Sequence, residues 1–119
     1  MKHVLVTGAS RGIGRAIALS LASRGARVAL HFNSDEAGAE QTRLAMAGSG
    51  HAIFGADLSD ADAIEPLWRR VMVGFGSIDA VVNNAGIYVE HSPLTSDYED
   101  WKGIVQHTFA TNCIGPAQL

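Results

Sequence analysis

The sequence predicts an α/β fold with a doubly wound parallel sheet, and three observations support this prediction. Short runs of apolar and β-branched residues alternate with longer amphipathic stretches. Glycine and polar turn residues separate these runs. The 119 residues are 47% hydrophobic and 18% charged, which suits one globular domain rather than a disordered chain. We therefore expect four strands and four helices over residues 1–119, arranged as a doubly wound half-sheet.

The first predicted strand and helix occupy the start of the chain. Residues 3–6 form a continuous apolar run, which is typical of a strand that a parallel sheet buries on both faces. The helix that follows is marked by apolar residues at helical spacing, namely Ile13, Ile17 and Leu21. Gly25 ends this helix, and residues 27–32 predict the second strand. Strand, helix and strand in this order form one βαβ unit with a right-handed crossover.

A second helix and a third strand follow. Residues 34–36 open an alanine-rich, weakly amphipathic helix that ends near Gly48 and Gly50. Asp35 suits the start of this helix, because a carboxylate there interacts favourably with the helix dipole. Residues 51–54 predict the third strand.

The third helix is predicted to begin near Ser59. Ser59 and Asp62 resemble a capping box, and apolar residues follow at helical spacing: Ile64, Leu67, Trp68, Val71 and Phe75. Pro66 lies within this pattern, where a proline removes a backbone hydrogen bond at a cost of about 3 kcal/mol. We therefore expect a kink at Pro66 or a helix that starts later.

The fourth strand and fourth helix complete the pattern. Residues 78–82 predict the strand, which would lie at the edge of the predicted half-sheet with unpaired backbone groups. Ser96 and Glu99 form a second capping box. One side of the helix after it contains Trp101, Ile104, Val105, Thr108 and Asn112.

A glycine-rich loop joins the first strand to the first helix. Residues 7–14 read Thr-Gly-Ala-Ser-Arg-Gly-Ile-Gly, with glycines at 8, 12 and 14. One glycine permits a tight turn, one lets the backbone approach a pyrophosphate, and one lets the helix pack closely on the strand. The alternative is a tight turn with no ligand. The position of the loop between a buried strand and a helix N-terminus favours a dinucleotide site.

Four separated motifs resemble the short-chain dehydrogenase/reductase family. They are the glycine loop of residues 7–14, Asp57 after the third strand, the Asn-Asn-Ala-Gly run of residues 83–86, and Asn112. The resemblance covers the whole chain in the family's order, and the glycine loop is most similar to 3-oxoacyl carrier-protein reductases. It implies a Rossmann-type fold in which residues 1–119 form the NAD(P)-binding domain without the carboxyl-terminal catalytic half.

The resemblance also implies the residues that bind the cofactor. They are Gly8, Ser10, Arg11, Gly12, Ile13, Gly14, Asn33, Ser34, Asp57, Leu58, Asn84, Ala85 and Gly86. In the family, the glycine loop binds phosphates, the aspartate accepts a hydrogen bond from the adenine amino group, and the Asn-Ala-Gly segment lines the adenosine pocket. The alternatives are a loop carboxylate beside Ser59 for Asp57 and a polar turn for residues 83–86.

The end of the second strand predicts which cofactor is preferred. A carboxylate about 20 residues after the glycine loop would bind the ribose 2′-hydroxyl and favour NAD. Here the strand ends in His-Phe-Asn-Ser, and the first carboxylate is Asp35. Arg11 offers a cation for a 2′-phosphate. We therefore expect NADP, and NAD remains the alternative if Asp35 reaches the ribose.

The resemblance implies only one catalytic residue in this chain. The family uses Asn, Ser, Tyr and Lys; Asn112 matches the Asn, whereas the other three follow it in the family's order. Tyr98 and Lys102 have Tyr-x-x-x-Lys spacing but precede Asn112, so we interpret them as a solvated first helical turn. Eleven residues separate Trp101 from Asn112 instead of the expected seven, which leaves the start of this helix in doubt.

The predicted function is that of a short-chain oxidoreductase that transfers hydride between NADP(H) and a carbonyl or secondary alcohol. The alternative is a non-catalytic dinucleotide-binding remnant or sensor. The net charge of −3 with scattered charges argues against a nucleic-acid partner, and no apolar run is long enough to cross a membrane. No metal site is expected, because His and Cys lack ligand spacing, and the single Cys113 suits a reducing, cytoplasmic location. In the family the fourth helix packs between subunits, so we expect a homo-oligomer of the complete enzyme.

Overall fold

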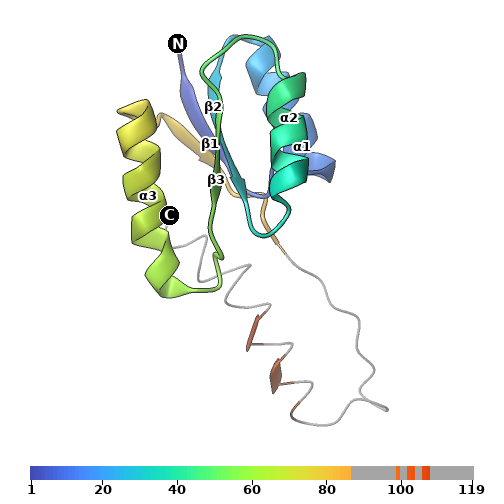
Figure 1. Ribbon diagram of the computed structural model, residues 1–119, viewed down its shortest axis with the longest axis vertical. Helices are drawn as coiled ribbons and strands as arrows, with labels where there is room; N and C mark the ends of the chain where they lie inside the picture. The colour runs from blue at the N-terminus through green and yellow to red at the C-terminus, as the bar shows by residue number, and fades with distance from the viewer. Residues whose placement is uncertain (87–98, 100–101, 104–105, 108–119) are drawn as a thin grey trace.

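Four parallel strands form one sheet in the computed structural model of the protein (Figure 1). Their order across the sheet is β3-β2-β1-β4, so β1 and β2 are central and β4 lies at one edge. The strands are β1 (His3–Val6), β2 (Arg27–Phe32), β3 (Ala52–Gly55) and β4 (Ala80–Val82). The structure describes residues 1–86, 99, 102–103 and 106–107.

Three helices cover the two faces of this sheet: α1 (Gly12–Ser23), α2 (Glu36–Ala45) and α3 (Ala61–Phe75). Helices α1 and α2 lie on one face and α3 lies on the other (Figure 1). The strand order explains this division. The chain moves from β1 to β2 to β3 in one direction and then returns past β1 to β4, and a right-handed crossover in the opposite direction must use the opposite face.

The hydrophobic core consists of two layers, because successive strand residues point to opposite faces of the sheet. One layer packs Val4, Val6, Val28 and Leu30 against Ala18 and Ala22 of α1. The other packs Leu5 and Ala29 against the α3 residues Ile64, Leu67, Val71 and Phe75. The alanines of α1 let that helix approach the sheet closely, whereas α3 fills its layer with large side chains. The predicted parallel half-sheet, the buried first strand and the first three helices are thus confirmed.

The start of α3 differs from the prediction. The N-cap is Asp60, whose carboxylate accepts a hydrogen bond from the Asp62 backbone N–H at 3.0 Å. The hydroxyl of Ser59 instead donates to the Asp57 carboxylate at 2.6 Å. The helix begins at Ala61 and continues through Pro66, so the predicted late start is wrong. The buried apolar residues on both sides of the proline hold this helix in place.

Of the predicted fourth helix, Glu99, Lys102, Gly103, Gln106 and His107 are helical, and the rest lies outside the described residues.

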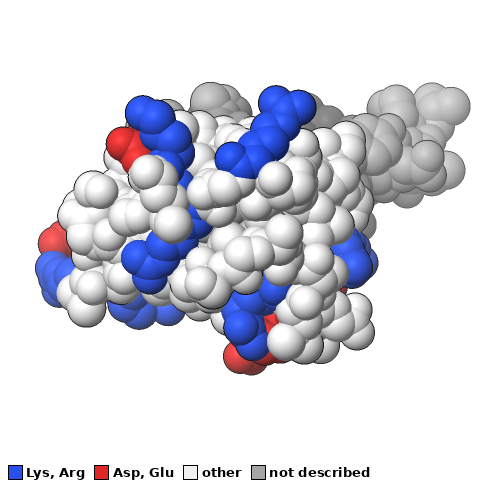
Figure 2. All heavy atoms as spheres, turned by 90° about the horizontal axis from the view of Figure 1, so that it is seen from above, with Lys and Arg blue, Asp and Glu red and all other residues white. Residues whose placement is uncertain are grey.

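Figure 2 shows one face of the molecule, on which Lys and Arg side chains lie at several separate places among uncharged atoms. No helix within the described part of the chain is long and apolar enough to cross a membrane.

Candidate functional site

A polar cavity of about 270 Å³ lies at the carboxyl ends of the strands. It is lined by Gly8, Ser10, Arg11, Asn33, Ser34, Asp35, Asn84, Ala85 and Gly86. These residues follow β1, β2 and β4. Because the chain leaves β1 towards one face and enters β4 from the other, this is the point where the strand order reverses, and open α/β sheets bind ligands there. Eight of the thirteen predicted cofactor residues therefore meet at one cavity.

The glycine loop has a separate physical reason for each glycine. Gly8 and Gly12 have φ angles of 66° and 61°, a left-handed conformation that other residues adopt at a cost. Gly14 lies so close to the preceding loop that a Cβ atom would be 2.1 Å from the Gly8 carbonyl oxygen. A Cβ at Gly12, by contrast, would meet no atom within 4 Å. The loop is thus tight at its base and open at the residue that starts α1.

The N-terminus of α1 differs from the starts of the other two helices. Asp35 caps α2 and Asp60 caps α3 through their carboxylates. At α1 the N-cap residue is Arg11, which makes no side-chain cap, and the first turn contains no acidic residue. The first N–H groups of a helix have no partner within it and favour an anion. The amide groups at the start of α1 are therefore the ones that an anionic ligand can reach.

A hydrogen-bond network fixes the glycine loop against β4. The Thr7 hydroxyl accepts hydrogen bonds from the backbone N–H groups of Asn84 and Ala85, both at 3.0 Å. The Asn84 side-chain amide donates to the carbonyl oxygens of Thr7 and Gly8 at 3.3 and 3.2 Å. Buried and half-buried polar groups therefore hold together two segments that both line the cavity. The sequence analysis included Thr7 in the glycine-loop motif but assigned it no role in the site, although a polar residue at the end of a buried strand was the available signal.

The loop is also fixed to β2 and α2. The Ser10 hydroxyl donates to the carbonyl of Asp35 at 2.8 Å, and the buried Thr42 hydroxyl of α2 donates to the carbonyl of Ala9 at 2.9 Å. His31 of β2 accepts from the Gly8 N–H at 3.1 Å. Neither His31 nor Thr42 was predicted to support the site, because these contacts join segments more than 20 residues apart in the sequence.

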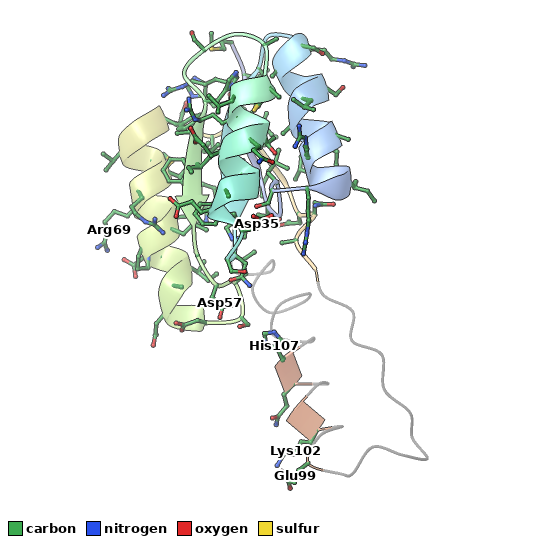
Figure 3. The ribbon with its side chains drawn as sticks, turned by 45° about the vertical axis from the view of Figure 1, so that its right-hand side comes forward. Asp35, Asp57, Arg69, Glu99, Lys102 and His107 are labelled. Carbon is green, nitrogen blue, oxygen red and sulfur yellow. The ribbon has the colours of Figure 1, made fainter. Side chains whose placement is uncertain are left out.

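Asp57 and Leu58 follow β3 and lie outside the cavity lining. The Asp57 carboxylate accepts hydrogen bonds from the hydroxyl and the N–H of Ser59, at 2.6 and 2.9 Å, and these bonds hold the pKa of this exposed carboxyl below its usual range. Leu58 is buried and belongs to the same hydrophobic cluster as Ile64 in the α3 layer. Figure 3 shows Asp35 near the start of α2 and Asp57 near the start of α3.

The end of β2 supplies exposed polar groups to the cavity. Asn33 and Ser34 are exposed and line it together with Arg11. Asp35 also lines it, but its Oδ1 atom accepts from the Gly38 N–H at 2.9 Å. The prediction that Asp35 starts a helix is confirmed by this cap. The cavity wall therefore contains one guanidinium and one carboxylate that is already hydrogen-bonded.

The other predicted residues divide into two groups. Gly12, Ile13 and Gly14 belong to α1 next to the cavity, and Ile13 exposes 72% of its side chain. Asn112 and Tyr98 lie outside the described residues, and Lys102 is exposed on a helical segment. Among the described residues there is no group of three or more His, Cys, Asp or Glu side chains that could hold a metal ion.

Comparison with known proteins gives consistent matches along the chain. The profile of the short chain dehydrogenase family matches residues 2–119. The chain is 37% identical over 120 residues to the 3-oxoacyl-acyl-carrier-protein reductase FabG of Staphylococcus aureus, with 98% of this chain and 49% of the relative covered. It is 51% identical over 98 residues to the L-rhamnose 1-dehydrogenase (NAD(P)(+)) of Azotobacter vinelandii, which covers 78% of this chain and 38% of the relative.

A solved structure agrees with these relatives. The short chain dehydrogenase of Burkholderia cenocepacia J2315 in complex with NADP superposes on this chain with a TM-score of 0.83 at 33% identity. The aligned region covers 98% of this chain and 47% of the Burkholderia chain. The chain thus spans about half the length of the relatives it matches. The matching residues include the glycine loop and the ends of all four strands described above. The chain therefore belongs to the short-chain dehydrogenase family.

Proposed function

We propose that this chain binds NADP(H) and belongs to an oxidoreductase that transfers hydride between NADP(H) and a carbonyl or secondary alcohol. The observation that supports this most strongly is the cavity at the carboxyl ends of β1 and β4, where the strand order reverses. The α1 N-terminus beside it has no side-chain cap, and Arg11 lines the cavity. An uncapped helix start and a guanidinium together favour an anionic ligand. The family membership supports a dinucleotide as that ligand.

The proposed cofactor position follows the sides of the cavity. The pyrophosphate lies over residues 8–14, where the α1 amide groups and the open backbone at Gly12 receive it. Residues 84–86 of the cavity lining, together with Asp57 and Leu58 outside it, would hold the adenosine. Ser59 binds only the Oδ1 atom of Asp57, so Oδ2 is the oxygen that we assign to the adenine amino group.

The preference for NADP over NAD depends on Arg11, Asn33 and Ser34. The 2′-phosphate of NADP adds negative charge at the adenosine ribose, and a guanidinium with nearby amide and hydroxyl groups matches it. A carboxylate that served NAD would have to accept from the ribose 2′-hydroxyl. Asp35 is the carboxylate of the cavity wall, and its bond to Gly38 commits Oδ1 to the start of α2.

Titration of the purified protein with NADPH and NADH tests this preference. Replacement of Arg11 by Ala removes a charge-assisted hydrogen bond and should therefore raise the dissociation constant of NADPH roughly tenfold or more. The NADH constant should change less than about twofold, because NADH lacks the 2′-phosphate. Arg24→Ala is the matched control, because Arg24 is an exposed arginine at the opposite end of α1. Tighter binding of NADH by the wild-type protein would contradict the NADP assignment.

The hydride-transfer activity is proposed from family membership. When bound, NADPH supplies a hydride to an electrophilic carbonyl carbon, and the protein orients the two reactants. Asn112 is the catalytic residue that we assign to this chain, as part of a set with Ser, Tyr and Lys. We propose a small-molecule substrate, a cytoplasmic location and a homo-oligomeric enzyme. A panel of ketones assayed for NADPH consumption tests the activity of this chain. Because only Asn112 of the catalytic set is assigned to it, we expect cofactor binding without sustained turnover, and sustained turnover would contradict that assignment.

A further inference from the structure

His31 lies beneath the candidate site as a buried side chain that joins two loops. It is 1% exposed and occupies the fifth position of β2. Its Nδ1 atom accepts the Gly8 N–H at 3.1 Å, and its Nε2 atom lies 2.8 Å from the carbonyl oxygen of Ala56. The His31 carbonyl also accepts the N–H of Ala9 at 2.9 Å. One residue therefore contacts both the glycine loop and the segment directly before Asp57.

The partners of the ring define its protonation state. A backbone N–H can only donate and a backbone carbonyl can only accept, so Nδ1 must be the unprotonated nitrogen and Nε2 must have the hydrogen. The neutral ring satisfies both bonds. A doubly protonated ring would place an N–H group against the Gly8 N–H and leave a buried donor without an acceptor, which is unfavourable.

We propose that neutral His31 is a positioning residue for the dinucleotide, because it holds the glycine loop and the loop of Asp57 in a fixed relative position. This inference rests on the proposed function, in which these loops bind opposite parts of NADP(H). Gly8 lies at the base of the phosphate-binding loop, and Ala56 immediately precedes the residue assigned to the adenine. Loss of the ring's two bonds, or its protonation, therefore moves one part of the site relative to the other.

The surroundings of the ring favour the neutral form. Burial lowers the pKa of His31, the positive Arg70 of α3 lowers it further, and the bond to the Ala56 carbonyl acts in the opposite direction. Arg70 itself donates to the Gly55 carbonyl at 2.7 Å. Asp35 and Asp57, which Figure 3 labels, already accept hydrogen bonds from nearby groups, Asp35 from the Gly38 N–H of α2 and Asp57 from Ser59.

The sign of the pH dependence follows from this lowered pKa. The pKa of His31 is lower in the folded protein than in the unfolded chain, where a histidine has a pKa of about 6.5. The stabilising contribution of the neutral ring is therefore complete above about pH 6.5 and is lost as the pH falls through the folded-state pKa. Cofactor affinity should weaken over the same acidic range.

Two variants of His31 and one control test the proposal. His31→Phe keeps a ring but removes both hydrogen bonds, and His31→Gln keeps hydrogen-bonding groups that do not titrate. His51→Gln is the matched control: the Nδ1 atom of His51 accepts the Val28 N–H at 3.1 Å and its Nε2 atom lies 2.8 Å from the Ala47 carbonyl. His51 thus has the same bonding pattern, but its bonds are at the opposite end of β2.

The first measurement is the dissociation constant of NADP⁺ from about pH 5 to pH 8 by calorimetry. The 2′-phosphate of the cofactor titrates near pH 6, so the quantity that matters is the difference between each variant and the wild type. We expect His31→Phe to bind roughly tenfold more weakly at neutral pH. In the wild type and in His51→Gln, protonation of His31 should weaken NADP⁺ binding at acidic pH. In His31→Gln this weakening should be absent.

The second measurement needs no cofactor and so separates this inference from the proposed function. The protection of the Gly8 amide against hydrogen exchange, taken relative to its intrinsic exchange rate at each pH, should decrease in acid in the wild type and be low at every pH in His31→Phe. Unchanged NADP⁺ affinity in a folded His31→Phe protein would overturn the proposal, as would an acid profile of His31→Gln identical to that of the wild type. If His31→Phe does not fold, the His31→Gln profile decides. If the wild type binds no NADP⁺, the proposed function fails and the Gly8 exchange rates still test the role of His31.

Discussion

Replacement of Gly14 by Ala is the most informative single change in the glycine loop. An added Cβ would lie 2.1 Å from the Gly8 carbonyl oxygen and 2.5 Å from the Asn84 side-chain nitrogen. Both distances are far below the 3.4 Å at which ordinary contacts begin, so the start of α1 must move by about 1 Å or the loop must change shape. The neighbouring atoms cannot yield easily, because Asn84 donates a hydrogen bond to that same carbonyl oxygen.

The free-energy change has two opposing parts. Overpacking of this kind costs about 1–3 kcal/mol, and the broken hydrogen bond adds about 1 kcal/mol. Ala is favoured over Gly within a helix by up to about 1 kcal/mol, which offsets part of the loss. We therefore expect Gly14→Ala to lower the free energy of unfolding by about 2 kcal/mol. NADPH binding should weaken as well, because the displaced loop is the proposed phosphate site.

Gly74→Ala is the matched control for this prediction. Gly74 is also helical, but an added Cβ there meets no atom closer than 3.6 Å. The same substitution should therefore raise the free energy of unfolding by about 0.5–1 kcal/mol through helix propensity alone. Urea denaturation followed by circular dichroism measures both values. Equal stability changes in the two variants would refute the argument that close packing, rather than backbone freedom, requires glycine at position 14.

Three further changes test other parts of the structure by the same denaturation assay. Thr7→Val should cost about 1–3 kcal/mol, because two N–H groups lose their acceptor, whereas Thr7→Ser should retain most of the stability. Asp60→Ala should cost about 1 kcal/mol through loss of the α3 N-cap, and Asp60→Ser should restore it; an unaffected Asp60→Ala protein would contradict the capping role. Arg69→Ala should change stability by less than about 0.5 kcal/mol, because its bond to Glu65 lies between exposed side chains, and a larger loss would show that this pair is not solvated.

Local patterns were sufficient to predict most elements of the fold. The apolar runs at residues 3–6 and 27–32 correspond to β1 and β2, which the sheet buries on both faces. The start of α3 could not be assigned in this way. Ser59 and Asp60 are both good N-cap residues, and the choice between them depends on the hydrogen bond that Ser59 makes to Asp57 in the folded loop.

The candidate site shows the same division between local and distant information. The family resemblance predicted that the glycine loop of residues 8–14 and the Asn84–Gly86 segment contact the same cofactor. In the structure both segments line one cavity at the carboxyl ends of β1 and β4. The supporting roles of Thr7 and His31 were not predicted. Their roles come from hydrogen bonds to residues more than 20 positions away, and no local pattern encodes such a contact.

The sequence by itself determined the strands, the helices, the glycine loop and the family resemblance, because each depends on residues that are close together along the chain. Only the tertiary structure decided the order β3-β2-β1-β4, the division of the helices between two faces and the cavity at the reversal point. It also decided that position 14 requires glycine because neighbouring atoms leave no room for a Cβ, rather than because of its backbone conformation, and that His31 must be neutral. These properties depend on which distant backbone groups face one another, and folding alone brings those groups together.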